Sequence, residues 1–251
     1  MLSPSEIAKK SVKIGKDKAE LPPLKMLLLG VFAGMFIALA GVGATFGNVY
    51  GGKIVGACIF PVGLIMVVLA GSELFTGNNL MLTSLFSKKI SLGQVFKNWL
   101  LVYFGNLIGA LLISLLVVYG GLFDGISESV INTTMNKINL GFGEALIRGI
   151  LCNFLVCIAV WMSFGAKTLS GKILAIFGPI MLFVFCGFEH SIANMFYGPA
   201  GVLVSIKNDV IVRGLTLDAF LFNNLLPVTI GNIIGGAGLV GCGYYLAYLK
   251  K

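Results

Sequence analysis

The chain has 251 residues, of which 57% are hydrophobic and 11% are charged, and its mean hydropathy is +0.98. A soluble domain carries about 25% charged residues and a disordered chain is poor in apolar ones, so the composition excludes both classes. The formal net charge of +8 does not indicate nucleic acid, because the lysines flank long apolar segments. The composition predicts an integral membrane protein whose surroundings are a lipid bilayer.

Six segments are long and apolar enough to cross a bilayer, which takes about 20 residues each. They are predicted over residues 26–50, 54–86, 98–122, 142–164, 173–205 and 220–247. The second and fifth are too long for one crossing and contain polar residues, so we expect breaks at Ser72–Asn79 and at Glu189–Asn194. Thirteen Lys and Arg residues fall on the side of the termini and four on the other side, which predicts that both termini are cytoplasmic.

Two sequence patterns recur in the second half of the chain. The pattern G-x-E-x-x-x-x-N begins at Gly71 and at Gly187, and N-x-L-x-x-x-x-G-N-x-I-G begins at Asn98 and at Asn224. Each second copy lies three spans after the first, and because three is odd it must cross the bilayer in the opposite sense. We therefore predict an all-α membrane domain over residues 26–251, an inverted repeat of 26–122 and 142–247 with a pathway between its halves.

Residues 1–25 form a cytoplasmic segment that is amphipathic and rich in lysine, and no cleavable signal peptide is apparent. Such a segment can lie on anionic lipid or can gate the inner mouth of a pathway, and the sequence leaves both open. The five cysteines fall in apolar stretches, where we interpret them as small core residues rather than disulfides or metal ligands. The known nucleotide, zinc and protease motifs are absent, so neither an enzyme nor a cofactor is expected.

Five ionisable residues fall within the predicted spans, where charge is costly and function is the first hypothesis. Glu144 and Arg148 are four residues apart on one helix, and we expect them to form a structural ion pair. Glu73 and Glu189 are equivalent in the repeat, and we expect each to tie down its chain break by accepting hydrogen bonds from backbone N–H groups. Two asparagines of the same pattern are expected to support these loops, namely Asn78 and Asn194.

His190 is the one histidine of the chain, and its repeat counterpart is Leu74. The halves thus differ where one of them carries a side chain that exchanges protons near neutral pH, so we predict that His190 lies in the pathway. Thr76 offers an uncharged polar group at the second-span break. Lys137, expected in a solvated loop, is a candidate attractor for anions.

Large apolar side chains in and near the broken spans are expected either to pack or to form dry constrictions that exclude hydrated ions. The sequence leaves this choice open. These side chains are Phe60, Leu64, Leu74, Phe75, Val156 and Phe183.

Taken together, the chain resembles the formate/nitrite transporter family, most of all its bacterial formate channel branch. The resemblance covers essentially the whole chain and is carried by Glu73–Thr76, Lys97–Asn106, Gly187–Phe196 and Pro227–Gly236. It implies an aquaporin-like protomer in a symmetric homopentamer of the bacterial cytoplasmic membrane, with one pathway in each subunit.

The resemblance also implies roles for single residues. His190 would be the central histidine with Thr76 hydrogen-bonded near it, and Lys137 would lie in the vestibule. Asn153 and Asn232 would be the paired asparagines of the pathway. Two hydrophobic constrictions are implied, one of Leu74 with Phe183 and one of Phe75 with Val156.

The family passes small monovalent anions of weak acids, so formate is the expected substrate, with nitrite and hydrosulfide as alternatives. Taking a bare anion out of water has an idealised cost on the order of 20 kcal/mol. Protonating an acid of pKa about 4 at pH 7 costs about 4 kcal/mol. We therefore expect His190 to control protonation of the permeating species, either by giving a proton directly or through water, or by staying neutral while the anion itself conducts.

A pore for water or small neutral solutes is the alternative from a different functional class. Water pores of this plan resemble one another in paired Asn-Pro-Ala loops, which this sequence lacks.

Overall fold

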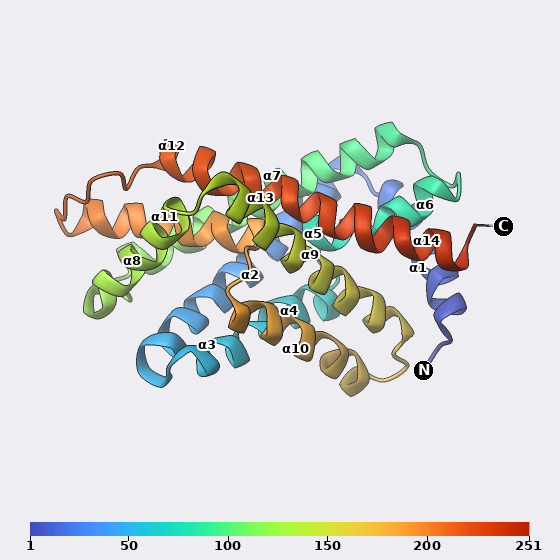
Figure 1. Cartoon of the computed structure of the whole chain (residues 1–251), viewed down its shortest axis with the longest axis horizontal. Coiled ribbons are helices and arrows are strands. Elements are labelled where there is room, and N and C mark those ends of the chain that lie inside the picture. The colour runs from blue at the N-terminus through green and yellow to red at the C-terminus, as the bar shows by residue number, and fades with distance from the viewer. Residues whose placement is uncertain (251) are drawn as a thin grey trace.

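The computed structural model describes residues 1–250, and every regular element over this range is a helix. Six segments are long and apolar enough to cross a membrane, which confirms the predicted number of spans. They cover Pro23–Gly51, Lys53–Ala70, Leu92–Tyr119, Phe142–Gly165, Leu169–Cys186 and Leu217–Tyr248. Both termini lie at one end of the molecule, as an even number of crossings requires (Figure 1), and we call this end the terminal side and the other the far side.

The helices follow one another with short connections. In chain order they are α1 (Pro4–Ala19), α2 (Pro23–Gly51), α3 (Lys53–Ile59), α4 (Pro61–Ala70), α5 (Phe75–Asn78), α6 (Leu82–Phe86), α7 (Leu92–Tyr119), α8 (Ser127–Ile138), α9 (Phe142–Gly165), α10 (Leu169–Cys186), α11 (Ser191–Lys207), α12 (Leu217–Phe220), α13 (Leu226–Ile233) and α14 (Gly243–Tyr248). Single 3₁₀ turns lie at Asn79–Met81 and Asp124–Ile126. The last span runs from α12 to α14 through π-helical turns at Leu221–Leu225 and Ile234–Cys242.

Glycine ends the first part of each broken span. α4 stops at Gly71 (φ 75°) and α10 stops at Gly187 (φ 74°), in the left-handed conformation that a residue without Cβ adopts at little cost. After a few extended residues the spans resume as α5 and α11. The two breaks are confirmed, but they begin before the predicted Ser72–Asn79 and Glu189–Asn194, because glycine geometry rather than polarity ends the helices.

Two amphipathic helices cover opposite ends of the molecule (Figure 1). α1 lies at the terminal side, where its apolar face, with Ile7 and Ser11 buried, packs on α6 and α9. α8 lies at the far side and packs on α11. The expectation of a loop around Lys137 is wrong, because this residue occupies the last turn of α8. Val130, Ile131, Thr134 and Ile138 are buried at helical spacing, so a periodic pattern typical of a helix was present in the sequence.

The two halves pack in the same way, which confirms the inverted repeat. α2 packs against α7, and the equivalent α9 packs against α13. A Cβ built on Gly105 would lie 3.0 Å from the Cα of Gly30, and one on Gly231 would lie 3.1 Å from the Cα of Gly149, so the backbones touch at both crossings. Since α1 leads into α2 from the terminal side and α8 leads into α9 from the far side, the second half is inverted.

Candidate functional site

Three cavities follow one another through the molecule. The terminal-side cavity has a volume of about 170 Å³ and lies between α1, α4 and the break before α5. The far-side cavity has about 150 Å³ and lies between α8, α10 and α11. Between them a central cavity encloses only about 10 Å³, which is roughly the least that holds one water molecule. The small solute that fits this route must leave most of its hydration behind at the centre.

The wall of the central cavity is apolar apart from His190. Phe60 meets Phe183 edge to face with 5.8 Å between ring centroids, and Phe183 stacks on the His190 ring at 5.9 Å. Five of the six predicted constriction residues gather here, namely Phe60, Leu64, Leu74, Val156 and Phe183. Ile37 and Ile180 complete the wall.

Hydrogen bonds fix both ring nitrogens of His190. As the N-cap of α11, its Nδ1 accepts the backbone N–H of Ala193 at 3.1 Å, and its Nε2 lies 2.9 Å from Thr76 Oγ1. Because Nδ1 accepts a hydrogen bond, we assign the proton of the neutral ring to Nε2, which donates to Thr76. The side chain is buried, with 3% of its surface exposed. His190 therefore presents one N–H at the junction of the two broken spans.

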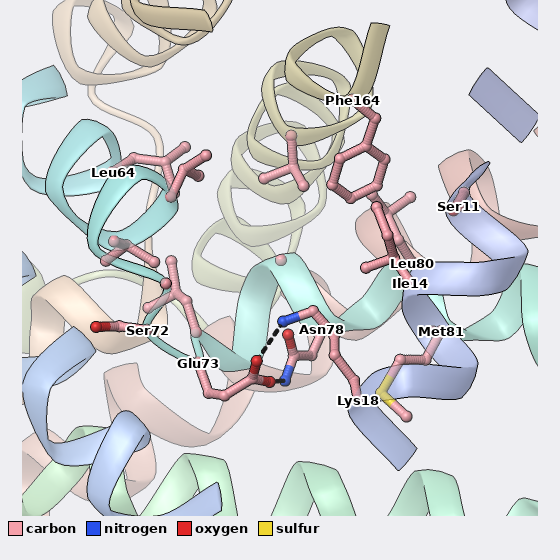
Figure 2. Close-up of a pocket in the computed structure, with 17 residues that line it drawn as sticks. Ser11, Ile14, Lys18, Leu64, Ser72, Glu73, Asn78, Leu80, Met81 and Phe164 are labelled. Atoms are coloured by element: carbon pink, nitrogen blue, oxygen red, sulfur yellow. Dashed lines mark hydrogen bonds and ion pairs between the residues drawn. The ribbon is translucent and has the colours of Figure 1, made fainter. Parts of the chain in front are cut away.

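The carboxylate of Glu73 organises the terminal-side cavity. It accepts Lys18 Nζ at 2.6 Å and Asn78 Nδ2 at 2.7 Å. Figure 2 shows Lys18 and Asn78 converging on Glu73 from two different elements. Asn78 also donates to Asn98 Oδ1 at 2.8 Å. Since Lys18 belongs to α1, a buried ion pair ties the N-terminal helix to the break.

Glu189 repeats this arrangement at the far-side cavity. Lys137 Nζ donates to both carboxylate oxygens at 2.9 and 3.0 Å, and Asn194 and Asn224 add amide donors at 2.6 and 3.2 Å. The ammonium group of Lys137 also lies 5.3 Å from the centroid of the Tyr197 ring, a cation–π distance. The carboxylates thus accept side-chain donors, whereas we expected backbone N–H groups.

Two other asparagines hold the backbone of the breaks. Asn106 accepts the first N–H of α5 at 3.0 Å and donates to the carbonyl of Glu73 at 2.9 Å. Asn232 accepts the first N–H of α11 at 2.9 Å and donates to the carbonyl of Glu189 at 3.0 Å. One asparagine from the third span of each half therefore binds the backbone groups of the break, a role that we had expected the two glutamates to fill.

The structure does not bring all predicted pathway residues to the three cavities. Asn232 holds the break, and Asn153 donates to the Asn232 carbonyl at 2.7 Å. The Phe75 ring packs edge to face on Tyr103, with 4.9 Å between centroids. Neither these three residues nor Thr76 line a cavity described above, so the place of all four in the pathway stays a prediction.

Lys18 and three asparagines of these networks were missed by the sequence reasoning: Asn98, Asn106 and Asn224. The signal was present, because the asparagines are fixed positions of the repeated patterns and Lys18 precedes Lys137 by 119 residues, close to the 116 between the two glutamates. The predicted ion pair of Glu144 and Arg148 is confirmed on the half-exposed surface of α9.

Comparison with known proteins supplies an independent view of this geometry. A model of the formate/nitrite transporter family matches residues 5–246. Formate channel FocA of Escherichia coli (strain K12) is 41% identical over 100% of this chain and 96% of its own, and uncharacterized transporter YrhG of Bacillus subtilis is 42% identical over 99% and 94%. A solved pentameric formate channel with formate bound superimposes with a TM-score of 0.82 at 35% identity, covering 91% of this chain and 98% of that one.

Proposed function

Because this chain belongs to the formate/nitrite transporter family, we propose that it conducts formate, or another small weak-acid anion such as nitrite or hydrosulfide, together with protons. The relatives named as formate channels support the substrate class, and the solved pentameric relative supports a homopentamer with one pathway in each subunit. The distribution of Lys and Arg supports a cytoplasmic terminal side in a bacterial cytoplasmic membrane. The family and these relatives are channels or transporters, which points to transport rather than catalysis.

The observation that carries the proposal is the dry central cavity, lined by seven apolar residues and His190, whose Nε2–H is held by Thr76 behind the wall. An anion that enters about 10 Å³ of apolar space loses its hydration, at an idealised cost on the order of 20 kcal/mol. The corresponding acid with a pKa of about 4 costs about 4 kcal/mol to form at pH 7. Passage as the neutral acid is therefore the cheaper route, and His190 marks the place where charge must be managed.

The hydrogen bonds of His190 suggest how it acts. A neutral ring whose Nδ1 accepts the Ala193 N–H has no spare proton to give, so direct donation requires that bond to break. We propose that His190 instead offers its Nε2–H, alternately to Thr76 and to an oxygen of the solute, while the proton arrives through water from the far-side cavity. This step favours the neutral acid of a compact, singly charged anion, because a larger solute cannot approach the ring past Phe60 and Phe183.

Lys137 supports the entry of the anion from the far side. Two of its three N–H bonds go to Glu189 in the described contacts, which leaves a third to meet an arriving carboxylate. Its side chain is 15% exposed and lines the same cavity as His190. Because Glu189 offsets most of the positive charge of Lys137, the lysine attracts the anion but binds it only weakly.

The test is uptake of formate, nitrite and hydrosulfide into proteoliposomes at two pH values, with the wild type and His190→Phe compared. We expect formate uptake that rises with acidity in the wild type, and loss of both the uptake and its pH dependence in His190→Phe. Uptake and pH dependence that are the same in the two proteins contradict the role of His190. A stopped-flow assay with glycerol serves as the control, because rapid glycerol flux without formate flux indicates a neutral-solute pore.

A further inference from the structure

The carbonyl oxygen of Thr76 is a meeting point for side chains of α9. Asn153 Nδ2 lies 3.3 Å and Cys157 Sγ lies 3.4 Å from this oxygen, which also accepts the backbone N–H of Asn79. Asn153 and Cys157 are four residues apart and so share one face of α9, and both are fully buried. α9 therefore contacts Thr76 through its carbonyl oxygen, while the hydroxyl group of Thr76 contacts His190.

These two donors do not belong to the duplicated scaffold. The offset of 119 residues that relates the two lysines of the ion pairs matches Asn153 with Gly34 and Cys157 with Ala38 on α2. Neither equivalent residue has a polar side chain. Thr76 itself departs from the repeat, since the two Glu positions match it with an isoleucine. The polar residues that break the symmetry thus collect in one place, around the hydrogen bond to His190.

The space around the two donors is filled. A Cβ built on Gly236, in the last span, would lie 2.2 Å from Asn153 Nδ2 and 2.8 Å from Cys157 Sγ. The two donors therefore occupy the space beside Gly236, where the last span approaches them closely. Because the space on that side is occupied, the length and the hydrogen-bonding chemistry of the two side chains determine the position of the Thr76 backbone.

We propose that Asn153 and Cys157 are positioning residues that set the place of Thr76 and, through its hydroxyl group, the orientation of the His190 Nε2–H. The transport consequence of this inference rests on the proposed function, whereas its structural consequence does not. Cys157 is the cleaner probe, because Asn153 also holds the carbonyl of Asn232.

The single histidine makes the structural consequence measurable, since ¹⁵N-histidine labelling gives one pair of ring signals. In the full-length protein in lipid nanodiscs, Cys157→Ala is expected to shift the Nε2 signal away from its hydrogen-bonded value. Cys157→Ser keeps a donor of similar size and is expected to restore the signal. The inference is overturned by an Nε2 signal that is the same in the wild type and in Cys157→Ala, whether or not the protein conducts formate.

Cys152→Ala is the matched control for this measurement. Cys152 is as buried as Cys157 and lies on the same helix, but no hydrogen bond of its thiol is found among residues 1–250. Its truncation is expected to leave the Nε2 signal in place. A shift of equal size in Cys152→Ala would assign the effect to packing alone and would overturn the inference.

Formate uptake into proteoliposomes gives the second measurement. Cys157→Ala is expected to lower the initial rate about three-fold, in line with the loss of one modest hydrogen bond, and Cys157→Ser to stay near the wild-type rate. In a Thr76→Val background, Cys157→Ala is expected to have no further effect, because no hydroxyl group remains to be positioned. Effects that multiply in the double variant overturn the inference. A wild type that takes up no formate contradicts the proposed function instead, and the ring signals then decide the inference.

Discussion

The terminal side and the far side of the molecule use the same ion pair, but they draw its lysine from different kinds of element. At the far side Lys137 comes from α8, which is joined to the spans at both of its ends. At the terminal side Lys18 comes from α1, which precedes the first span and packs on α6 and α9. The Lys18 side chain is also the more exposed of the two, at 23% against 15%. The ion pair of the terminal side is therefore the more accessible of the two to water.

A second difference between the halves lies at the centre. The groups that hold the backbone are duplicated, since Glu73 and Glu189 are equivalent and so are Asn106 and Asn232. The apolar lining of the central cavity is duplicated as well, since Ile37 matches Val156 and Leu64 matches Ile180, but His190 stands where the first half has Leu74. We infer that duplication supplies the scaffold and that departures from it mark the residues that meet the solute.

The largest effect is expected from removing the two carboxylates one at a time. Glu189→Ala leaves the Lys137 ammonium and two amides without their acceptor in a buried place, so we expect a loss of about 3–5 kcal/mol in the free energy of unfolding. Glu73→Ala is expected to cost about half as much, because Lys18 can turn to solvent when α1 loosens. Unfolding in mixed detergent micelles measures both.

Glu144→Ala is the control for this pair of variants. Its ion pair with Arg148 is half exposed, so its removal is expected to change stability by no more than about 1 kcal/mol. Equal losses for Glu73→Ala and Glu189→Ala would mean that both ends of the molecule are held alike, which contradicts the comparison above.

The next effect concerns the lysines. Lys137→Met leaves Glu189 unpaired in the cavity that His190 also lines, so an arriving anion meets a negative charge. We expect formate uptake to fall at least ten-fold. Lys18→Met leaves Glu73 unpaired in a cavity that His190 does not line, and a two- to three-fold decrease is expected. Initial rates in proteoliposomes measure both variants. A larger effect of Lys18→Met would contradict the expectation that the far-side ion pair matters more for anion entry than the terminal-side one.

The sequence predicted the six spans, the two breaks and the inversion, because each depends on composition or on a repeated pattern. It did not predict α8 or the docking of α1. Both helices carry an amphipathic pattern, but such a pattern does not say against which element the apolar face packs. Spacing also does not say which way a side chain points. Asn153 and Asn232 were expected in the pathway by resemblance, yet their amides are engaged by the backbone of the breaks and of the last span.

The prediction for His190 illustrates the other limit. Its isolation in one half of the repeat was visible in the sequence and drew attention to it. Thr76 was implied as one partner by the family resemblance, but Ala193 was not foreseen, because its bond depends on the extended backbone of the break and on where α11 begins. The sequence pattern therefore identifies His190 as a candidate, but the protonated ring nitrogen can be assigned only from the structure.

A smaller effect is expected from loosening α1 itself. A Cβ on Gly15 would lie 2.1 Å from Ser84 Oγ and 3.4 Å from the Cα of Met81, so Gly15→Val overpacks the contact of α1 with α6 and the 3₁₀ turn before it. Overpacking of this kind costs about 1–3 kcal/mol. We expect faster proteolysis within residues 1–22 while the spans stay intact. Lys13→Ala changes an exposed side chain on the same helix and serves as the control. Unchanged proteolysis of Gly15→Val would show that α1 is held as firmly as α8.

The smallest expected effect is a pH dependence at the first turn of α1. Glu6, outside the spans, accepts hydrogen bonds from the hydroxyl group and the backbone N–H of Ser3, and these bonds lower its pKa below the ordinary 4.5. Because the pKa is lower in the helix than in the frayed chain, the stabilisation is present above pH 4.5 and is lost as the pH falls through the lowered pKa. We expect the first turn of α1 to fray on acidification while α8 keeps its place. The carboxyl ¹³C shift of Glu6 follows this titration, and in Ser3→Ala its midpoint is expected to return toward 4.5. A midpoint that is the same in both proteins would mean that the cap does not bind the carboxylate in solution.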